Sequence, residues 1–240
     1  MNIEEKINKF DKIIKYSDNI VFFGGAGVST ESGIPDFRSK DGLYNQKYKF
    51  APEEILSHTF FINNTEEFFK FYKEKLNSLD IKPNITHLKL AELEAKGKLR
   101  AIITQNIDGL HQKAGSNNVL ELHGSVLRNY CMKCNKFYDA EYVFNCKGIP
   151  KCSCGGIIKP DVVLYGENLN EDTIDKSIYY IENAETLIVG GTSLMVYPAN
   201  GLIRYFRGKN LILINKDATQ YDIVANLVIN EKLGKIFSTI

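Results

Sequence analysis

A series of short, mostly apolar runs, each ending in glycine or polar residues, constrains the fold of this sequence more than any other feature. The runs span residues 20–23, 99–103, 119–122, 187–189 and 211–214, and the residues that follow them are Gly24, Thr104, His123, Gly190 and Asn215. Runs of this length between turn-forming residues are typical of strands buried on both faces of a parallel sheet. Helical patterns at residues 87–96 and 198–206 supply connections of the kind that parallel strands need. The sequence therefore predicts an α/β fold with a doubly wound parallel sheet.

The polar residues after these strands are expected to meet in one crevice, because parallel strands end at the same edge of a sheet. After the first strand, segment 24–30 is rich in glycine, so its backbone amides can approach a phosphate closely at the start of a helix. Thr30 stands where the dinucleotide-binding fingerprint has its third glycine. Taken alone, this segment is equally compatible with a phosphate site and with a tight turn that binds no ligand.

His123 is the candidate general base, because it directly follows a predicted strand and imidazole has a near-neutral pKa. Gln105, Asn106 and Asp108 follow the neighbouring strand and are expected to converge on the same crevice. Without these neighbours a purely structural histidine would be the simpler interpretation. Ser29 lacks the G-x-S-x-G surroundings of a nucleophilic serine, which favours a ligand contact over covalent catalysis.

The cysteines predict a structural metal site. All five lie between Cys131 and Cys154, where Cys131 and Cys134 form C-x-x-C and Cys152 and Cys154 form C-x-C. Four thiolates on two such turns suit one tetrahedral zinc ion, and a closed site of this kind leaves no position for a substrate. We interpret Cys146, outside both pairs, as a small apolar residue. Lysines outnumber acidic residues here, so a nucleic-acid-binding zinc ribbon remains the alternative, although no arginine or stacked-aromatic pattern accompanies them.

The overall charge gives no reason to expect nucleic acid or a membrane as a partner. Lys and Arg total 30 and Asp and Glu total 29, so the formal net charge is +1. The N-terminal segment lacks the pattern of a secretory leader, and no apolar stretch approaches the length of a membrane span. We therefore expect a cytoplasmic protein; the sequence carries no signal for its oligomeric state.

Taken together, the motifs resemble those of the sirtuin family of NAD-dependent protein deacylases, in the family's order and over nearly the whole chain. The closest likeness is to bacterial members that remove acetyl groups from lysine. The motifs are Gly25-Ala26-Gly27-Val28-Ser29, Gly33-Ile34-Pro35-Asp36-Phe37-Arg38, Thr104-Gln105-Asn106-Ile107-Asp108, His123-Gly124, the two cysteine pairs, Val163-Leu164-Tyr165-Gly166-Glu167 and Gly191-Thr192-Ser193-Leu194.

The resemblance implies a Rossmann-like NAD-binding domain made of residues 1–40, 81–127 and 160–240. A smaller lobe would combine a helical insertion at 41–80 with a zinc-binding insertion at 128–159. Substrate and cofactor would enter between the two parts.

The resemblance also implies which residues contact NAD. Ala26, Thr30 and Arg38 are expected at its phosphates or a ribose, and Phe37, Ile107 and Asp108 at nicotinamide. Gln105 and Asn106 are expected at the nicotinamide ribose. The residues expected at the adenosine half are Gly191, Thr192, Ser193 and Asn215. The residues implied as catalytic are His123, as the base, with Asn106 and Asp108.

In the reaction that the resemblance implies, the acetyl-lysine carbonyl oxygen attacks the ribose carbon of NAD as nicotinamide leaves. His123 then activates a ribose hydroxyl, and the products are free lysine, nicotinamide and O-acetyl-ADP-ribose. A mono-ADP-ribosyltransferase acting on proteins and a catalytically inactive NAD or ADP-ribose sensor are the alternatives. The intact set of His123, Asn106 and Asp108 favours the deacetylase.

Acetyl-lysine proteins or peptides are the implied partners, and they would bind by strand addition along Val163 and Tyr165. Tyr165 stands where the family usually has phenylalanine, and it places a hydroxyl at the acyl-lysine tunnel. Members that remove acidic acyl groups carry Tyr-x-x-Arg, whereas the corresponding residues here are Phe69 and Tyr72. A buried acyl carboxylate would have no cationic partner, so we expect acetyl over succinyl groups.

Overall fold

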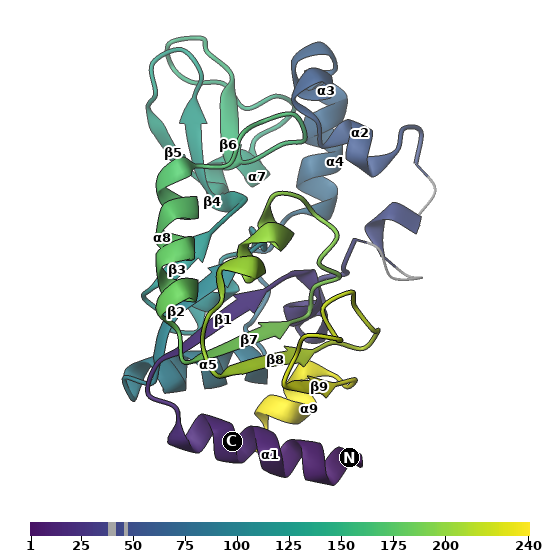
Figure 1. Cartoon of the computed structure of the whole chain (residues 1–240). Coiled ribbons are helices and arrows are strands. Elements are labelled where there is room, and N and C mark those ends of the chain that lie inside the picture. The colour runs from purple at the N-terminus through teal and green to yellow at the C-terminus, as the bar shows by residue number, and fades with distance from the viewer. Residues whose placement is uncertain (38–41, 46–47) are drawn as a thin grey trace.

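A parallel six-stranded sheet forms the larger part of the computed structural model, which describes all residues except 38–41 and 46–47 (Figure 1). Its strands are β1 (Ile20–Gly24), β2 (Leu99–Thr104), β3 (Val119–Glu121), β7 (Thr186–Gly190), β8 (Asn210–Ile214) and β9 (Leu227–Ile229). They pair in the order β3-β2-β1-β7-β8-β9, and every pairing is parallel. This is the strand order of a Rossmann-like doubly wound sheet, so the predicted fold class is confirmed.

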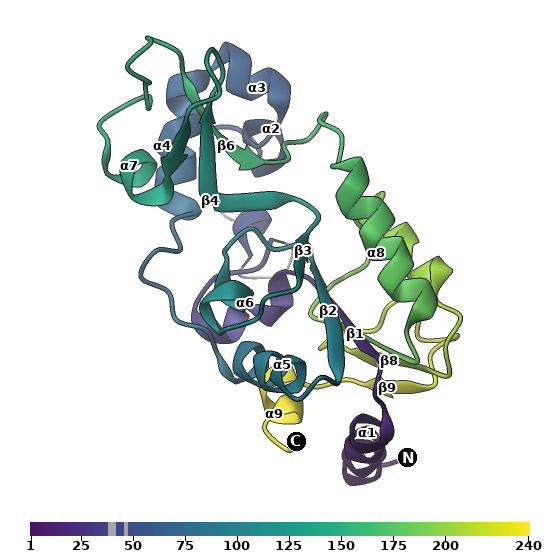
Figure 2. The same ribbon diagram turned by 90° about the vertical axis from the view of Figure 1, so that its left-hand side faces the viewer.

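Helices cover both faces of this sheet, as Figure 2 shows for α5 and α8. The elements against one face are α1 (Ile3–Tyr16), α5 (Ile85–Ala95) and α9 (Leu233–Phe237), with α6 (Leu110–Lys113) beside α5; those against the other are α8 (Glu171–Asn183) and the 3₁₀ helix η4 (Ala199–Tyr205). Phe22 and Ile102 point into the first core, and Phe23 and Ile103 point into the second. Alternation along the strands therefore buries both faces.

Asparagine side chains begin the three longest helices against the sheet. Asn2 accepts a hydrogen bond from the backbone N–H of Glu5, Asn84 from that of Thr86, and Asn170 from that of Thr173. Such caps contribute about 1 kcal/mol each to stability.

An antiparallel sheet and several short helices form a second part of the molecule, drawn at the top of Figure 1. Its elements are β4 (Gly124–Cys131), β5 (Phe137–Asp139), β6 (Ile158–Val162), α2 (Pro52–Ile55), α3 (His58–Asn63), α4 (Thr65–Lys75) and α7 (Ala140–Asn145), and the sheet order is β5-β4-β6. They share an aromatic core, in which the ring of Tyr72 stacks on that of Phe144 at 5.3 Å between centroids. Segments 55–72 and 126–164 thus pack together although they are distant in sequence.

Three local features differ from the sequence-based expectation. Strand β9 was not predicted, although Leu227-Val228-Ile229 is a short apolar run that ends in a polar residue, Asn230, like the other runs. The glycine-rich segment itself forms a 3₁₀ turn, η1 (Ala26–Val28), and leads into a second one, η2 (Thr30–Ser32), instead of an α-helix. Gly33 ends the second turn with a φ of +94°. The predicted helix at 198–206 is a 3₁₀ helix, with Gly201, a weak helix former, at its centre. A further 3₁₀ turn, η3, spans Leu43–Asn45.

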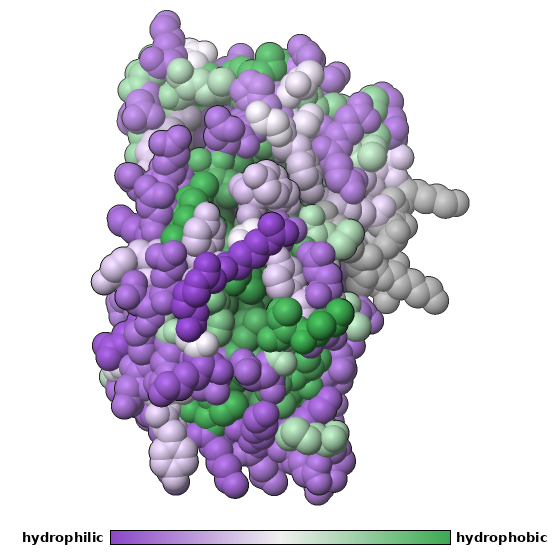
Figure 3. Space-filling model, viewed as in Figure 1, coloured by the Kyte–Doolittle hydropathy of each residue, from purple (hydrophilic) through white to green (hydrophobic). Residues whose placement is uncertain are grey.

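Hydrophilic residues cover most of the face shown in Figure 3, and apolar residues gather near its centre. Among the described residues, no helix combines the length and the apolar character needed to cross a membrane.

A buried histidine pair between α5 and α6 makes the fold sensitive to acid. The rings of His87 and His111 lie 4.8 Å apart, and within the described part of the chain both nitrogens of His111 and Nε2 of His87 are buried without a hydrogen-bond partner. Burial lowers the pKa of His87 to about 4, and burial together with His87 lowers that of His111 to about 3. Both rings are therefore neutral in the fold at pH 7.

Because both pKa values lie below the unfolded value of about 6.5, stability is full above pH 6.5 and is lost as the pH falls toward 4. We expect the free energy of unfolding to drop by about 1.4 kcal/mol per pH unit for each histidine. Urea titrations between pH 7.5 and 5 measure this slope, and His111→Leu should reduce it by about half. A slope that is the same in both proteins would contradict the assignment.

Candidate active site

The carboxyl ends of β1, β2, β7 and β8 meet at one edge of the sheet, as predicted, and hydrogen bonds join them. The side chain of Gln105 donates to Oγ1 of Thr192 at 3.0 Å, and the backbone N–H of Thr192 donates to Oδ1 of Asn215 at 2.9 Å. Nδ2 of Asn215 is buried without a partner among the described residues. A buried donor of this kind calls for an acceptor, which a ribose or adenine of NAD would provide.

The glycine-rich segment packs too tightly against the end of β7 for side chains to fit. The backbone N–H of Gly27 donates to the carbonyl of Gly191 at 2.8 Å, and a Cβ on Gly27 would lie 2.7 Å from Cα of Gly191. A Cβ on Gly25 would lie 2.8 Å from Cβ of Thr192. Glycine-rich backbone of this type, without side chains in the way, suits the phosphates of a dinucleotide. Thr30, on the same segment, donates its hydroxyl to the carbonyl of Gly27 at 3.0 Å.

Asn84 anchors this segment from α5, a role that the sequence analysis missed. Its Nδ2 donates to the carbonyl of Val28 at 2.8 Å and to Oγ of Ser32 at 3.0 Å, while its Oδ1 caps the helix. An asparagine before a helix predicts a cap, but nothing in sequence predicts the second contact.

Ser29, Asn106 and Asp108 form a small hydrogen-bonded network. Oγ of Ser29 donates to Oδ2 of Asp108 at 2.6 Å and accepts from Nδ2 of Asn106 at 3.0 Å. The backbone N–H of Leu110 donates to the other carboxyl oxygen of Asp108 at 2.9 Å. Burial raises the pKa of Asp108, while the bonds from Ser29 and Leu110 act in the opposite direction. Ser29 thus fixes the Asp108 carboxyl group in place, which the sequence analysis did not anticipate.

His123 lies between β3 and β4, and a backbone carbonyl determines which of its two ring nitrogens carries the proton. Its Nδ1 is 2.9 Å from the carbonyl oxygen of Gln105, an acceptor, so Nδ1 carries the proton and Nε2 is the basic nitrogen. Burial lowers the pKa of His123, and the bond to Gln105 partly offsets this effect. The ring is therefore neutral and able to accept a proton at pH 7.

The stretch that contains Val163 and Tyr165 connects His123 to the helices of the second part. The backbone N–H of Val163 donates to the carbonyl of His123 at 3.0 Å. Tyr165 donates its backbone N–H to Leu56 and accepts from that of His58, both at 2.9 Å.

Glu167 closes the turn after this stretch, another role that the sequence analysis missed. Its Oε2 accepts from the backbone N–H of Leu164 at 2.9 Å and from Lys159 at 3.0 Å, and its Oε1 is 2.8 Å from Nδ1 of His58. These bonds hold the turn in one conformation.

The remaining predicted NAD contacts occupy different surroundings. Phe37 and Ile107 are half-buried beside the aromatic core, and Phe37 packs on Tyr44. Ala26 is half-buried in η1, and Ser193 is exposed after β7. Arg38 lies outside the described residues.

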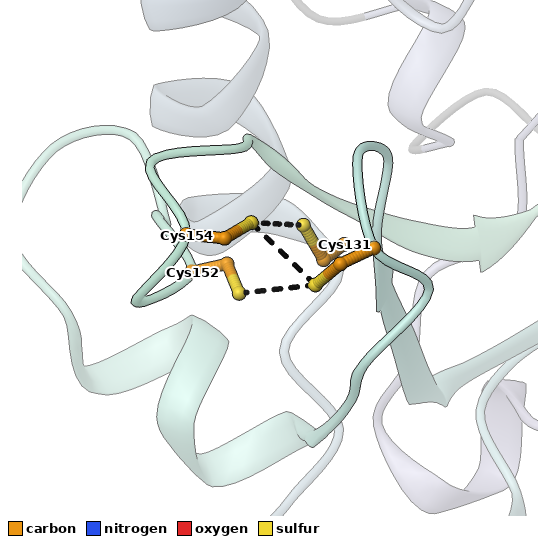
Figure 4. A group of neighbouring side chains, drawn as sticks. Cys131, Cys152 and Cys154 are labelled. Carbon is orange, nitrogen blue, oxygen red and sulfur yellow. Dashed lines mark hydrogen bonds between the residues drawn. The ribbon is translucent and has the colours of Figure 1, made fainter.

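The four predicted zinc ligands form a cluster at the far end of the antiparallel sheet (Figure 4). The sulfur atoms of Cys131, Cys134, Cys152 and Cys154 all lie within 4.8 Å of one another. The distances are 3.5 Å for Cys131–Cys154 and Cys134–Cys154, and 3.6 Å for Cys134–Cys152. Tetrahedral zinc with bonds of about 2.3 Å requires sulfur separations of about 3.8 Å, so the cluster fits one zinc ion held by four thiolates. Cys146 lies apart from it, with its sulfur 3.1 Å from Nζ of Lys73.

Comparison with known proteins agrees with this arrangement. The model of the Sir2 family matches residues 25–198. The chain is 62% identical to an NAD-dependent protein deacetylase of Clostridium perfringens over 99% of both chains, and 61% identical to one of Clostridium acetobutylicum over 100% of both.

Solved Sir2 structures share the whole fold. One, from a study of the mechanism and regulation of Sir2 enzymes, is 41% identical with a TM-score of 0.89 and covers 98% of this chain and 96% of its own. Another, a complex with a deacetylated p53 peptide and 3'-O-acetyl ADP ribose, is 39% identical with a TM-score of 0.88 and covers 97% and 96%. The family model matches this chain, the relatives align with it over nearly its full length, and the solved structures have the same fold. This chain therefore belongs to the Sir2 family.

Proposed function

We propose how this chain, an NAD-dependent protein deacetylase, divides its reaction among the residues of the site. The reaction removes acetyl groups from lysine and yields nicotinamide and O-acetyl-ADP-ribose. The observation that carries the proposal is the state of His123, a neutral imidazole with its basic Nε2 available and its Nδ1 tied to the backbone of Gln105. A base fixed in this way needs no reorganisation before it accepts a proton.

NAD binds along the carboxyl edge of the sheet. Its phosphates lie against the glycine-rich segment near Ala26 and Thr30, and its adenosine half is held by residues after β7 and β8. These are Gly191, Thr192, Ser193 and Asn215, with Nδ2 of Asn215 as an available donor. We assign Arg38 to the phosphates from the sequence resemblance alone.

The nicotinamide end lies beside the network of Ser29, Asn106 and Asp108, with Phe37 and Ile107 as the apolar part of the pocket. Bound NAD supplies a ribose carbon that becomes electrophilic as nicotinamide leaves. The carboxyl group of Asp108, held by Ser29 and Leu110, orients the carboxamide of nicotinamide through hydrogen bonds. The apolar side chains exclude water from the reacting carbon, which protects it from hydrolysis.

The acetyl carbonyl oxygen would bond to the ribose carbon as the bond to nicotinamide breaks. His123 would then accept a proton at Nε2 from a ribose hydroxyl, whose oxygen attacks the acetyl carbon. One water molecule would complete the transfer as the bond between the acetyl carbon and the lysine nitrogen breaks and lysine leaves as the free amine. Gln105 and Asn106 position the same ribose. Removal of the proton by a positioned base typically contributes a factor of about 10² to 10⁴.

The acetyl-lysine peptide adds as a strand along the stretch that contains Val163 and Tyr165. The backbone N–H and carbonyl of Tyr165 already bond to Leu56 and His58, so the main-chain pairing uses other groups of this stretch, and Tyr165 contributes its side chain. Main-chain pairing is tolerant of the peptide's sequence, so many acetylated proteins would qualify as substrates. Segments 41–80 and 128–159 form a small lobe beside the peptide-binding stretch. Zinc holds segment 128–159 together and takes no part in catalysis. We assign the protein to the cytoplasm, without nucleic acid or membrane as a partner.

Incubation with acetylated, unmodified and succinylated peptides, with and without NAD, tests this function. With the acetylated peptide and NAD we expect mass spectrometry to show loss of one acetyl group and release of nicotinamide, and neither change with the unmodified peptide or without NAD. The succinylated peptide should have a kcat/KM at least tenfold lower, because its carboxylate finds no cationic partner at Phe69 and Tyr72. Mass added to a protein with the acetyl group retained would indicate ADP-ribosyl transfer instead.

A further inference from the structure

A hydrogen bond between two tyrosine hydroxyls joins the NAD side of the site to the peptide side. The hydroxyl oxygens of Tyr44 and Tyr165 lie 2.7 Å apart, although the residues are 121 positions apart in sequence. We propose that this bond couples the binding of acetyl-lysine peptide to the binding of NAD. The inference rests on the proposed function, because it takes Phe37 as part of the nicotinamide pocket and Tyr165 as part of the peptide site.

On the NAD side, Tyr44 is tied to Phe37 through both its backbone and its ring. The backbone N–H of Tyr44 donates to the carbonyl of Phe37 at 2.8 Å, and that of Leu43 donates to Asp36 at 2.9 Å. The rings of Phe37 and Tyr44 are 5.3 Å apart with an interplanar angle of 56°. A shift of Tyr44 therefore changes the position of Phe37.

On the peptide side, the main chain of Tyr165 is fixed and its side chain is the adjustable element. Bonds to Leu56 and His58 hold its backbone, and Val163 is bonded to His123. The side chain of Tyr165 is 41% exposed. A peptide paired along Val163 and Tyr165 would pack against this ring and restrict its motion, which favours the conformation bonded to Tyr44.

The two ligands then stabilise the same contact from opposite sides. A nicotinamide group packed on Phe37 fixes Tyr44, and a peptide packed on Tyr165 fixes the other hydroxyl. By thermodynamic linkage, each ligand raises the affinity of the other by the same factor. One hydrogen bond of ordinary strength corresponds to a factor of about two to ten.

Phenylalanine substitutions test the coupling because they remove only the hydroxyl groups. The probe is a fluorescent acetyl-lysine peptide, titrated by anisotropy with and without a saturating carbocyclic NAD analogue, whose nicotinamide cannot leave. The ratio of the two Kd values is the coupling factor. We expect Tyr165→Phe and Tyr44→Phe each to lower it about two- to tenfold, and the double variant to lower it no further. Tyr179→Phe, an exposed tyrosine on α8, is the matched control and should leave it unchanged.

Unchanged coupling in the single variants, or losses that multiply in the double variant, would overturn the inference. A wild-type chain with a coupling factor of one would do the same. If the wild-type chain bound neither the peptide nor the analogue, the proposed function would fail together with the coupling. If the wild-type chain deacetylates the peptide but Tyr165→Phe leaves the coupling factor unchanged, the proposed function stands and only the coupling proposal is refuted.

Discussion

Substitution of His123 by alanine is expected to lower kcat for deacetylation by about 10² to 10⁴ while leaving NAD binding largely intact. The imidazole is the proposed proton acceptor, and its neutral state at pH 7 follows from burial, which lowers its pKa. Because the proposed NAD site includes many other groups along the sheet edge, loss of one ring should change the Kd for NAD only slightly. Initial rates with an acetylated peptide, together with calorimetric titration of NAD, measure both quantities.

His123→Asn is the matched control for positioning. Its side-chain amide can donate to the carbonyl of Gln105, as Nδ1 does, but it has no basic nitrogen. If His123 acts as the base, asparagine should be as inactive as alanine. Recovery of activity in His123→Asn, or a rate for His123→Ala close to that of the wild-type chain, would refute the assignment.

The pH profile of kcat/KM gives an independent check. Since burial lowers the pKa of His123, the neutral and active form persists below the ordinary pKa of histidine. Activity should therefore be constant near neutral pH and should decline only on the acidic side of the ordinary histidine pKa.

Loss of zinc is expected to unfold the β4–β6 region and to abolish deacetylation. Segments 55–72 and 126–164 both contribute to the aromatic core of the second part, and Cys131 and Cys152 are buried in this core. Binding of structural zinc supplies about 10–16 kcal/mol in small zinc domains, so the region cannot keep its fold without the ion. For Cys152→Ser we expect zinc to fall from one equivalent to none, the thermal midpoint to drop by more than 10 °C and peptide binding to disappear.

Cys146→Ser is the matched control, since this thiol lies outside the cluster and should leave one equivalent of zinc in place. Metal analysis, circular dichroism and peptide titration of the two variants separate a structural ion from a catalytic one. A zinc-free protein that kept its fold and peptide affinity but lost turnover would show that the metal is catalytic.

The sheet was predictable from sequence because its inner strands are apolar on both faces and end in polar residues. The run 20–23 and the run 187–189 became the adjacent strands β1 and β7. The run 227–229 has the same form and became β9, but it was not recognised as a strand. The cysteine cluster was predictable for a different reason: zinc geometry fixes the spacing of its ligands locally.

Contacts between distant segments could not be predicted. Asn84 is recognisable as a helix cap, but its bond to the glycine-rich segment depends on where the packing of α5 against β2 places the start of that helix. The sequence indicates a ligand contact for Ser29. Only the fold shows that Asp108, 79 residues later, lies beside it and accepts its hydrogen bond. The Tyr44–Tyr165 bond likewise depends on tertiary packing, because the η3 turn and the stretch that contains Tyr165 both lie beside α2.

The central claim is that the acetyl group passes from lysine to the ribose of NAD, and an isotope label tests it most directly. A peptide whose acetyl-lysine carries ¹⁸O in the acetyl carbonyl is incubated with the protein and NAD, and the products are separated by mass spectrometry. If the carbonyl oxygen attacks the ribose carbon, the label appears in O-acetyl-ADP-ribose, in an amount equal to the nicotinamide released. Label in free acetate, with NAD intact, would show simple hydrolysis and would contradict the account.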